Sequence, residues 1–316
     1  MSRKGICPGF VIAPFDLSNP IFTISDIEVC NWEEVINTVD KSYPPTTIFN
    51  FPNRSTEECE HKYLIESIQE IINDDPNCKI IASKVIIKKG KIDVKSSFLN
   101  LCSNFPDAFI FMIHTPYSGN WLGASPELLL RSADNTLYTY ALAGTRPAGT
   151  KGEWDDKNIK EQRIVKDFIT DTLKKFNIRP ECSGTETRRA GSVEHLLTEI
   201  NSSISENINV IGLLDDLSPT PALSGYPKEM AMKAIDKLEA NPRGFYGGFV
   251  GPYSKNEDFC FYVNLRSVCF LTDRYCMQVG GGITALSDPK EEWIETERKA
   301  KSILSHLILK TTGLTN

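Results

Sequence analysis

Short runs of apolar residues separated by polar turns predict strands along much of the chain. Residues 78–93 are rich in β-branched side chains and end in a Lys-Gly turn, which predicts a strand and the start of a hairpin. In residues 127–143, two apolar runs flank a polar turn at residues 133–135, a pattern typical of a hairpin. Four further runs predict strands: residues 108–115, 245–253, 259–270 and 275–279, the last ending in Gly280, Gly281 and Gly282.

Three other segments have the three- and four-residue spacing of apolar side chains that is typical of helices. The first follows the aspartates at 155–156, the second covers residues 228–238, and the third follows Ser287. Ser287 is the predicted cap of the last helix, with Asp288 and Pro289 in its first turn. Because most strands join through hairpins, we predict an α+β fold with large antiparallel β-sheets flanked by helices.

The composition is that of a globular protein that acts on small molecules. The hydrophobic fraction of 41% and the charged fraction of 24% are near the averages for globular chains. The net charge is −6 and no basic run occurs, so the long-range attraction that nucleic-acid binding needs is missing. The sequence contains no repeat and no flexible linker, and we therefore expect a single domain over residues 1–316.

The cysteines and the first apolar stretch indicate a cytoplasmic protein. The nine cysteines include no CxxC pair, which is typical of reduced thiols and of neither disulfides nor a zinc site. Residues 5–15 are interrupted by Pro8 and Pro14 and followed by Asp16, which fits neither a signal peptide nor a membrane span. We expect no membrane partner and no nucleic-acid partner.

Two helices place carboxylates where a cation could bind. Glu292, Glu295 and Lys299 have the spacing i, i+3 and i+7, which puts them on one helix face; alone, such a face is typically solvated. Glu161 lies on an apolar helix face, which is costly unless the carboxylate is paired, neutral or bound to a cation. Oxygen ligands on facing helices suit Mg²⁺, and a buried ion pair is the alternative.

Arg266 and the three glycines predict a receptor for a carboxylate. A period of two in VNLRSV places Arg266 on the same strand face as Asn264. A guanidinium near the bare backbone N–H groups of residues 280–282 would bind a carboxylate, so we expect an anionic substrate with more than one carboxylate. The alternative for the glycines is a tight turn.

Several ordered sequence strings resemble the chorismate-using enzymes, which include isochorismate, salicylate, anthranilate and aminodeoxychorismate synthases. The resemblance runs from about Lys79 to Ala300 and is weaker over residues 1–70, which we interpret as a reduced N-terminal portion of the chorismate-binding domain. The strings are WLGASPELLLR (121–131), ALAGTRP (141–147), KEQRIVKDF (160–168), VEHLLTEI (193–200), LSPTPALSGYP (217–227), RGFYGGFVG (243–251), FYVNLRS (261–267), VGGGI (279–283) and DPKEEWIETERKA (288–300).

The resemblance implies an anthranilate synthase component I-like fold, the substrate chorismate and a role for each matching residue. Glu161 and Glu295 would hold Mg²⁺, which binds the ring carboxylate, and Glu292 would support the metal. The remaining substrate-binding positions implied are Arg266, Tyr246, Gly281 and Gly282 for the pyruvyl carboxylate, Lys299 beside it, His195 in the pocket wall, and Gly144 and Thr145 on the C4 side. A satisfied core histidine is the alternative for His195.

Lys79 and Glu127 match the general base and general acid of isochorismate and salicylate synthases. Anthranilate synthases typically carry Gln at the first position and use ammonia. Lys79 can act as a base only when neutral, which desolvation would favour; without the resemblance it would be interpreted as a surface lysine. Glu127 would protonate the departing C4 hydroxyl. Ala143 replaces the lysine that aminodeoxychorismate synthases use as a nucleophile.

We therefore predict an isochorismate synthase, an isomerase that needs Mg²⁺ and no obligatory protein partner. Menaquinone synthesis is its expected pathway, and catechol siderophore synthesis is the alternative. Salicylate synthase and anthranilate synthase component I are the alternatives within the family. Without the resemblance, Glu127 and Glu161 could also be the carboxylate pair of a glycoside hydrolase. A non-catalytic relative is disfavoured because the chain keeps Lys79, Glu127 and the metal glutamates.

Overall fold

The structure is a computed structural model that describes residues 7–25, 33–34, 51–73, 75, 77–190, 193–204, 208–254 and 258–310. Much of the predicted N-terminal portion, namely residues 1–6, 26–32 and 35–50, lies outside the described residues. Among the described residues, no helix is long and apolar enough to cross a membrane.

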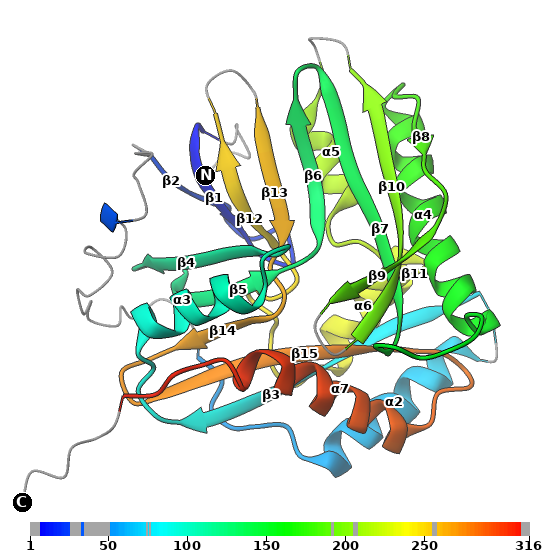
Figure 1. Ribbon diagram of the computed structural model, residues 1–316. Helices are drawn as coiled ribbons and strands as arrows, with labels where there is room; N and C mark the ends of the chain where they lie inside the picture. Colours follow the sequence, from blue (N-terminus) through cyan, green and yellow to red (C-terminus); the bar gives the residue numbers. More distant parts are fainter. Residues whose placement is uncertain are drawn as a thin grey trace, which may run out of the picture.

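The described strands form two antiparallel sheets, one of nine strands and one of six (Figure 1). The nine-stranded sheet has the order β2 (Phe22–Ile24), β1 (Gly9–Ala13), β12 (Phe249–Tyr253), β13 (Phe259–Val263), β6 (Leu128–Ala133), β7 (Thr136–Pro147), β10 (Val193–Ser203) and β8 (Glu181–Cys182), with β9 (Glu186–Ala190) also on β10. The six-stranded sheet has the order β11 (Gly225–Tyr226), β3 (Lys79–Lys89), β15 (Arg274–Ile283), β14 (Ser267–Phe270), β5 (Gly119–Ser125) and β4 (Phe109–Thr115).

Helices cover both sheets and carry polar side chains toward the region between them. On the nine-stranded sheet, α4 (Asp156–Lys175) packs against β7 and β10, and α5 (Val210–Leu217) packs on α4. The helices that pack on the six-stranded sheet are α2 (Glu58–Ile72), α3 (Val94–Asn104), α6 (Lys228–Leu238) and α7 (Pro289–Leu304). The predicted α+β class with large antiparallel sheets is therefore confirmed.

One apolar core joins the two sheets. It includes Leu130, Phe249 and Phe261 of the nine-stranded sheet together with Ile80 and Ile283 of the six-stranded sheet. All five side chains are fully buried. Burial of each such side chain contributes about 1.5–3 kcal/mol. The shared core therefore fixes the two sheets relative to each other, and with them residues that are far apart in sequence.

Most of the predicted elements are confirmed, but one hairpin is not. The strand in 78–93, the hairpin of β6 and β7, and the helices α4, α6 and α7 form as predicted, and Asp155 caps α4 by accepting from the Asn158 N–H. The turn after β3, however, leads into α3, and β3 pairs with β15 and β11 instead. Its pairing partners are distant in sequence, so local turn chemistry did not reveal them.

The predicted strand over 259–270 is wrong, because it breaks into two strands that belong to different sheets. After β13, the Asn264 N–H still donates to the Gly248 carbonyl, which continues the register of β12 and β13 by one residue. Arg266 then adopts a left-handed conformation with φ 49°, and β14 begins at Ser267 in the other sheet. Arg266 is thus presented from a turn, and not from a strand face shared with Asn264.

Three further predictions in the C-terminal part of the chain need correction. The glycines at 280–282 do not end a strand: β15 continues through them and pairs them with Ser83, Ala82 and Ile81 of β3. Asp288 rather than Ser287 caps α7, since its carboxylate accepts from the N–H groups of the next turn. The strand predicted from residue 245 begins only at Phe249, after a turn.

Candidate active site

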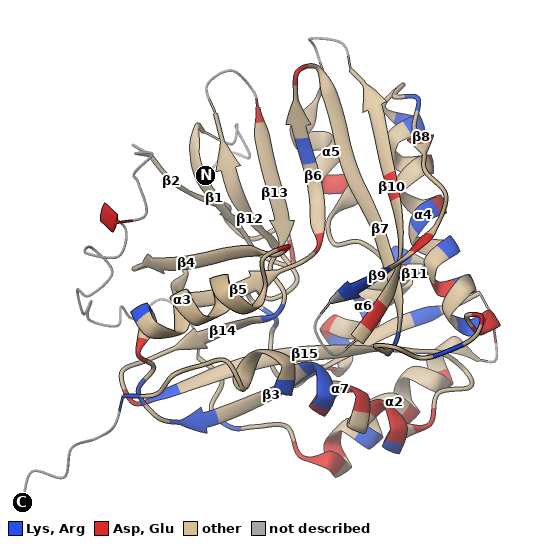
Figure 2. Ribbon diagram, viewed as in Figure 1, with Lys and Arg blue, Asp and Glu red and all other residues tan. Residues whose placement is uncertain are grey.

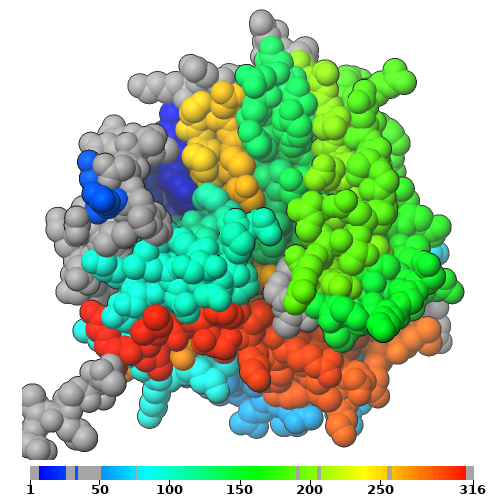
Figure 3. Space-filling view, viewed as in Figure 1, coloured from blue at the N-terminus to red at the C-terminus, as the bar shows by residue number. Residues whose placement is uncertain are grey.

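A cavity with an empty volume of about 930 Å³ lies between the two sheets, and eight of the predicted site residues line it. They are Glu127, Gly144, Thr145, Glu161, His195, Tyr246, Arg266 and Lys299. The molecular surface is hollowed between α3, the β9–β10 region and α7 (Figure 3). Lys79, Gly281, Gly282, Glu292 and Glu295 do not line the cavity; Lys79 and Glu295 are bonded to residues that do.

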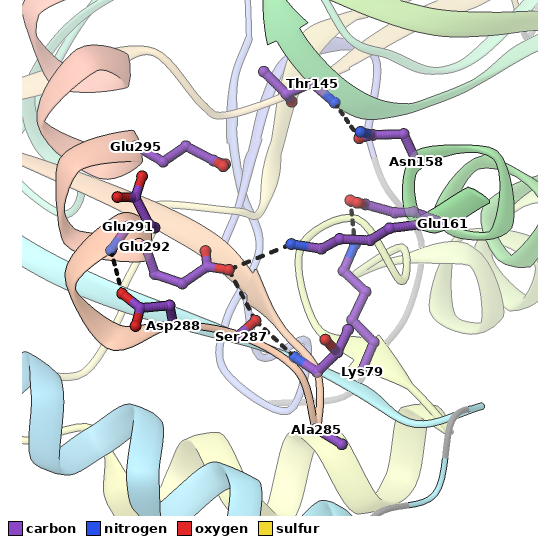
Figure 4. Close-up of polar contacts among 12 residues, drawn as sticks. Lys79, Thr145, Asn158, Glu161, Ala285, Ser287, Asp288, Glu291, Glu292 and Glu295 are labelled. Carbon is purple, nitrogen blue, oxygen red and sulfur yellow. Dashed lines mark hydrogen bonds and ion pairs between the residues drawn. The ribbon is translucent and has the colours of Figure 1, made fainter. Parts of the chain in front are cut away.

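Lys79, the first residue of β3, is buried and forms an ion pair with Glu161 of α4 (Figure 4). The Nζ atom lies 2.5 Å from Glu161 Oε1. Burial alone would raise the pKa of Glu161, but the charge and hydrogen bond of Lys79, aided by Lys299, outweigh it and lower that pKa. Glu161 is therefore ionised, as a cation ligand must be, and its present counterion is an ammonium group.

Gly281 and Gly282 leave room for two charged side chains behind the cavity wall. A Cβ atom at Gly282 would lie 2.3 Å from Lys79 Cε, and one at Gly281 would lie 2.9 Å from Glu292 Oε2. Any larger residue at 282 would displace Lys79. In this structure the two glycines therefore admit Lys79 and Glu292, and their predicted contact with a substrate carboxylate is not seen in the cavity lining.

Glu127 lies at the start of β6 with its carboxyl group buried in the cavity wall. Its backbone is anchored because its carbonyl accepts from the Val263 N–H. Burial raises the pKa of Glu127 to about 7, against the lowering effects of Thr220, Arg266 and Lys79. Thr220 has the largest of these lowering effects, although its hydroxyl makes no hydrogen bond of ordinary length. A carboxyl group with this pKa is substantially protonated near neutrality and can donate a proton.

Arg266 presents its guanidinium to the cavity beside His195 and forms no ion pair with any described residue. The His195 Nδ1–H donates to the Gly144 carbonyl at 2.8 Å, so the Nε2 atom can accept from Arg266 Nη2 at 3.2 Å. Burial and the Arg266 charge lower the pKa of His195 to about 4. His195 is thus a neutral acceptor that orients Arg266, whose positive charge remains available to an anion.

Gly144 and Thr145 line the cavity opposite α7, and α4 holds them in place. The Thr145 N–H donates to Asn158 Oδ1 at 2.9 Å, and Asn158 is in turn bonded to the capping Asp155. Gly144 has φ 73°, and a Cβ atom there would lie 3.2 Å from Asn158. The left-handed backbone and the close contact both require glycine at this position.

The carboxylates of α7 face Glu161 and carry lysine partners of their own. Lys299 Nζ lies 2.8 Å from Glu295 Oε1, and the charge of Lys299 lowers the pKa of Glu295. Burial raises the pKa of Glu292, which pairs with Lys157 at 3.5 Å. Each of the three carboxylates Glu161, Glu292 and Glu295 is therefore neutralised by a different lysine.

The three carboxylates fit a hard divalent cation in their chemistry. Glu292 Oε2 is buried with no hydrogen-bond partner, an arrangement that costs free energy unless a cation or donor reaches it. The charge of Glu295 acts to raise the pKa of both Glu161 and Glu292, which places the three groups in one electrostatic cluster. As their side chains stand, no three potential ligands in the described residues are arranged to hold an ion.

Sequence reasoning missed several residues that shape this site. Asn158 and Lys157 lie in the first turn of α4, where the cap signal drew attention only to the aspartates at 155–156. Thr220 acts on Glu127 from a segment that includes the cis peptide Ser218–Pro219. Arg298 lines the cavity beside Lys299, although its sequence neighbours gave no reason to single it out.

The fold and the site match a known family. A family model described as chorismate binding enzyme matches residues 25–305. The chain belongs to the chorismate binding enzymes.

Among curated relatives, both isochorismate and anthranilate synthases are similar to this chain. Isochorismate synthase MenF of Haemophilus influenzae is 34% identical over 197 residues, which are 58% of this chain and 45% of that protein. Anthranilate synthase component 1 of Pseudomonas putida is 31% identical over 291 residues, which are 86% of this chain and 57% of that protein. The chain spans about half the length of the curated relatives it matches.

Solved structures of both enzyme types share the fold. MenF, the menaquinone-specific isochorismate synthase from Escherichia coli, superposes with a TM-score of 0.74 at 26% identity, covering 87% of this chain and 68% of that one. Anthranilate synthase component I from Streptococcus pneumoniae also gives a TM-score of 0.74, at 18% identity, covering 96% of this chain and 82% of that one. The second likeness concerns the fold alone.

Proposed function

We propose that this protein is an isochorismate synthase, which converts chorismate to isochorismate by adding water at C2 and releasing the C4 hydroxyl. The observation that carries the proposal is a carboxyl group with a pKa of about 7 in the cavity wall and a lysine amine bonded to Glu161 of the same wall. Lys79 is close enough for its charge to lower the pKa of Glu127. A base for water and an acid for the leaving hydroxyl are the two groups this reaction requires.

The residues divide the work of binding and catalysis. Arg266 binds the pyruvyl carboxylate, and Tyr246 and Lys299 complete that side of the cavity. Lys79 removes a proton from the attacking water, and Glu127 donates a proton to the C4 oxygen as the ring double bonds shift. Gly144 and Thr145 border the C4 side, where α4 fixes their backbone through Asn158.

The proposal includes Mg²⁺ held by Glu161 and Glu295, with support from Glu292. Bound there, Mg²⁺ would neutralise the ring carboxylate of chorismate and compete with Lys79 for Glu161. Lys79 can serve as a base only when its amine is neutral, so it must leave its ion pair with Glu161. Glu161 thus links the proposed metal site to the proposed base, because it is both a metal ligand and the ion-pair partner of Lys79.

Anthranilate synthase component I is the second candidate, supported by relatives of similar identity over more of the chain. It would form anthranilate from chorismate and ammonia. The test is to incubate the purified chain with chorismate and Mg²⁺, with and without ammonium, and to separate the products by chromatography. Isochorismate alone supports the proposal; anthranilate formed with ammonium, or salicylate formed without it, contradicts it. The menaquinone pathway stays a prediction.

A further inference from the structure

A second chamber, with an empty volume of about 630 Å³, adjoins the active-site cavity beside β7, β9 and β10 of the nine-stranded sheet. Both spaces are lined by Pro126, Leu142, His195 and Arg266. The Arg266–His195 hydrogen bond therefore lies where the two spaces adjoin. We call the second space the outer chamber; the last residue of α3, Asn104, and the turn that follows it to Ala108 form its opposite side.

The charges in the lining of the outer chamber favour an anion. The charged residues that line it are Arg188, Arg189 and Arg266 against a single carboxylate, Asp107. Arg188 is fixed by Glu186 at 3.0 Å and by Glu199 at 3.6 Å. Basic residues stand out on β9 at this face of the molecule (Figure 2). A local positive lining matters because the net charge of −6 repels an anion at long range.

The position of Arg266 connects this lining to the reaction. Arg266 is the one arginine shared by the outer chamber and the active-site cavity among their described lining residues. An anion held by Arg188 and Arg189 needs only to move along the chamber to reach the Arg266 guanidinium. His195 stays neutral and offers it no competing charge.

We propose that the outer chamber is the passage by which the dicarboxylate substrate reaches the active-site cavity, and that Arg188 and Arg189 bind one of its carboxylates before Arg266 does. The identity of the substrate class rests on the proposed function. The passage itself rests on the lining residues that the two spaces share and on the arginine lining. The other side of the cavity, at Arg298 and Ser302 of α7, is the competing route.

A steric plug tests the passage by kinetics. Ala108 lines the outer chamber and lies outside the active-site cavity, so Ala108→Trp narrows the chamber without touching the catalytic residues. The probe is 5-fluoroisophthalate, an aromatic dicarboxylate whose ¹⁹F line shape gives association and dissociation rates. Because a plug obstructs movement in both directions, both rates should fall by about tenfold while Kd stays unchanged. Ser103→Trp, at an exposed position of α3 that lines neither space, should leave both rates as in the wild-type protein.

The role of the arginines is tested by salt dependence. Arg188→Gln with Arg189→Gln should lower the association rate about tenfold at low salt and flatten its dependence on ionic strength. Arg274→Gln is the matched control, because Arg274 is a strand arginine of similar exposure that lies beside Asp273 and lines neither space. Unchanged rates in Ala108→Trp, a change in its Kd alone, or no probe binding by the wild-type protein would overturn the proposal.

The probe also separates this proposal from the proposed function. If the wild-type protein forms no product from chorismate but Ala108→Trp slows the probe, the passage stands and the proposed function fails. If the wild-type protein forms isochorismate and the plug leaves the probe rates unchanged, the function stands and the substrate enters elsewhere.

Discussion

The Lys79 ammonium lies 2.5 Å from the Glu161 carboxylate, which joins the start of β3 to α4 across the gap between the sheets. In this state Lys79 is a counterion and cannot accept a proton, while Glu161 is ionised and ready to bind a cation. The ion pair therefore couples the protonation of the proposed base to the occupancy of the proposed metal site.

Removing the carboxyl group of Glu127 should abolish proton donation to the leaving hydroxyl. Glu127→Gln keeps the size of the side chain, and we expect kcat to fall by about 10²-fold or more, the usual contribution of a general acid. In the wild-type protein, kcat should fall as pH rises through about 7, because the pKa of Glu127 is raised to about 7. A pH–rate profile measures both, and a profile that is flat from pH 6 to pH 9 would exclude Glu127 as the acid.

The same carboxyl group should make stability depend on pH. Its folded-state pKa of about 7 lies above its ordinary value of 4.5, so the folded protein binds more protons than the unfolded chain between those values. Stability should fall by roughly 3 kcal/mol as pH rises across this window. Urea denaturation at several pH values should show a smaller fall in Glu127→Gln; an equal fall in both proteins would contradict the assignment.

Filling the space at Gly282 should displace the base. Gly282→Ala places a Cβ atom 2.3 Å from Lys79 Cε, so the amine must move and kcat should fall by about 10²-fold. Gly184→Ala is the control, because a Cβ atom there meets no atom within 4 Å. Thermal unfolding should confirm that both variants fold, and a Gly282→Ala enzyme with wild-type kcat would show that the position of Lys79 does not matter.

Metal dependence should follow the α7 carboxylates. A chelator should abolish activity and Mg²⁺ should restore it, and Glu295→Gln or Glu292→Gln should raise the Mg²⁺ concentration needed for half-maximal activity about tenfold or more. Glu291→Gln, an exposed neighbour in the first turn of α7, should change nothing. Equal Mg²⁺ requirements in all three variants would rule out this metal site.

His61, which lies away from the site, should destabilise the folded protein. Both of its ring nitrogens are buried without a hydrogen-bond partner, and its ring packs edge-on against Trp293. Burial and the charge of Lys84 lower its pKa to about 4, so stability should fall as pH drops from about 6.5 to about 4. His61→Phe keeps the ring contact, and we expect it to stabilise the protein by about 1–2 kcal/mol and to weaken this acid sensitivity. A lower Tm for His61→Phe at neutral pH would contradict this account.

The sequence was most informative where a local pattern determines an element. The apolar spacing of α4 and the polar turn of the β6–β7 hairpin are local patterns, and both elements form as predicted. The break at Arg266 was not predictable, because the alternation continues through a residue whose left-handed backbone sends the chain into the other sheet. Likewise, the local sequence around the glycines at 280–282 does not distinguish a turn from a strand. The strand forms, and its glycines leave space for the side chains of Lys79 and Glu292.

For the site, the residue types were predictable but their partners were not. The eight predicted site residues that line the cavity all lie within the family strings. Lys79 and Glu161 are 82 positions apart, and their pairing emerges only when the two sheets pack together. The support of Thr145 by Asn158 depends in the same way on the docking of α4.

The most direct test of the central claim is the fate of solvent oxygen. The purified chain should be incubated with chorismate and Mg²⁺ in H₂¹⁸O, and the product should be analysed by chromatography with mass spectrometry. Water addition through Lys79 predicts isochorismate with one ¹⁸O atom in its C2 hydroxyl, and no such product from Lys79→Gln. Unlabelled isochorismate, or labelled isochorismate formed equally well by Lys79→Gln, would contradict the account.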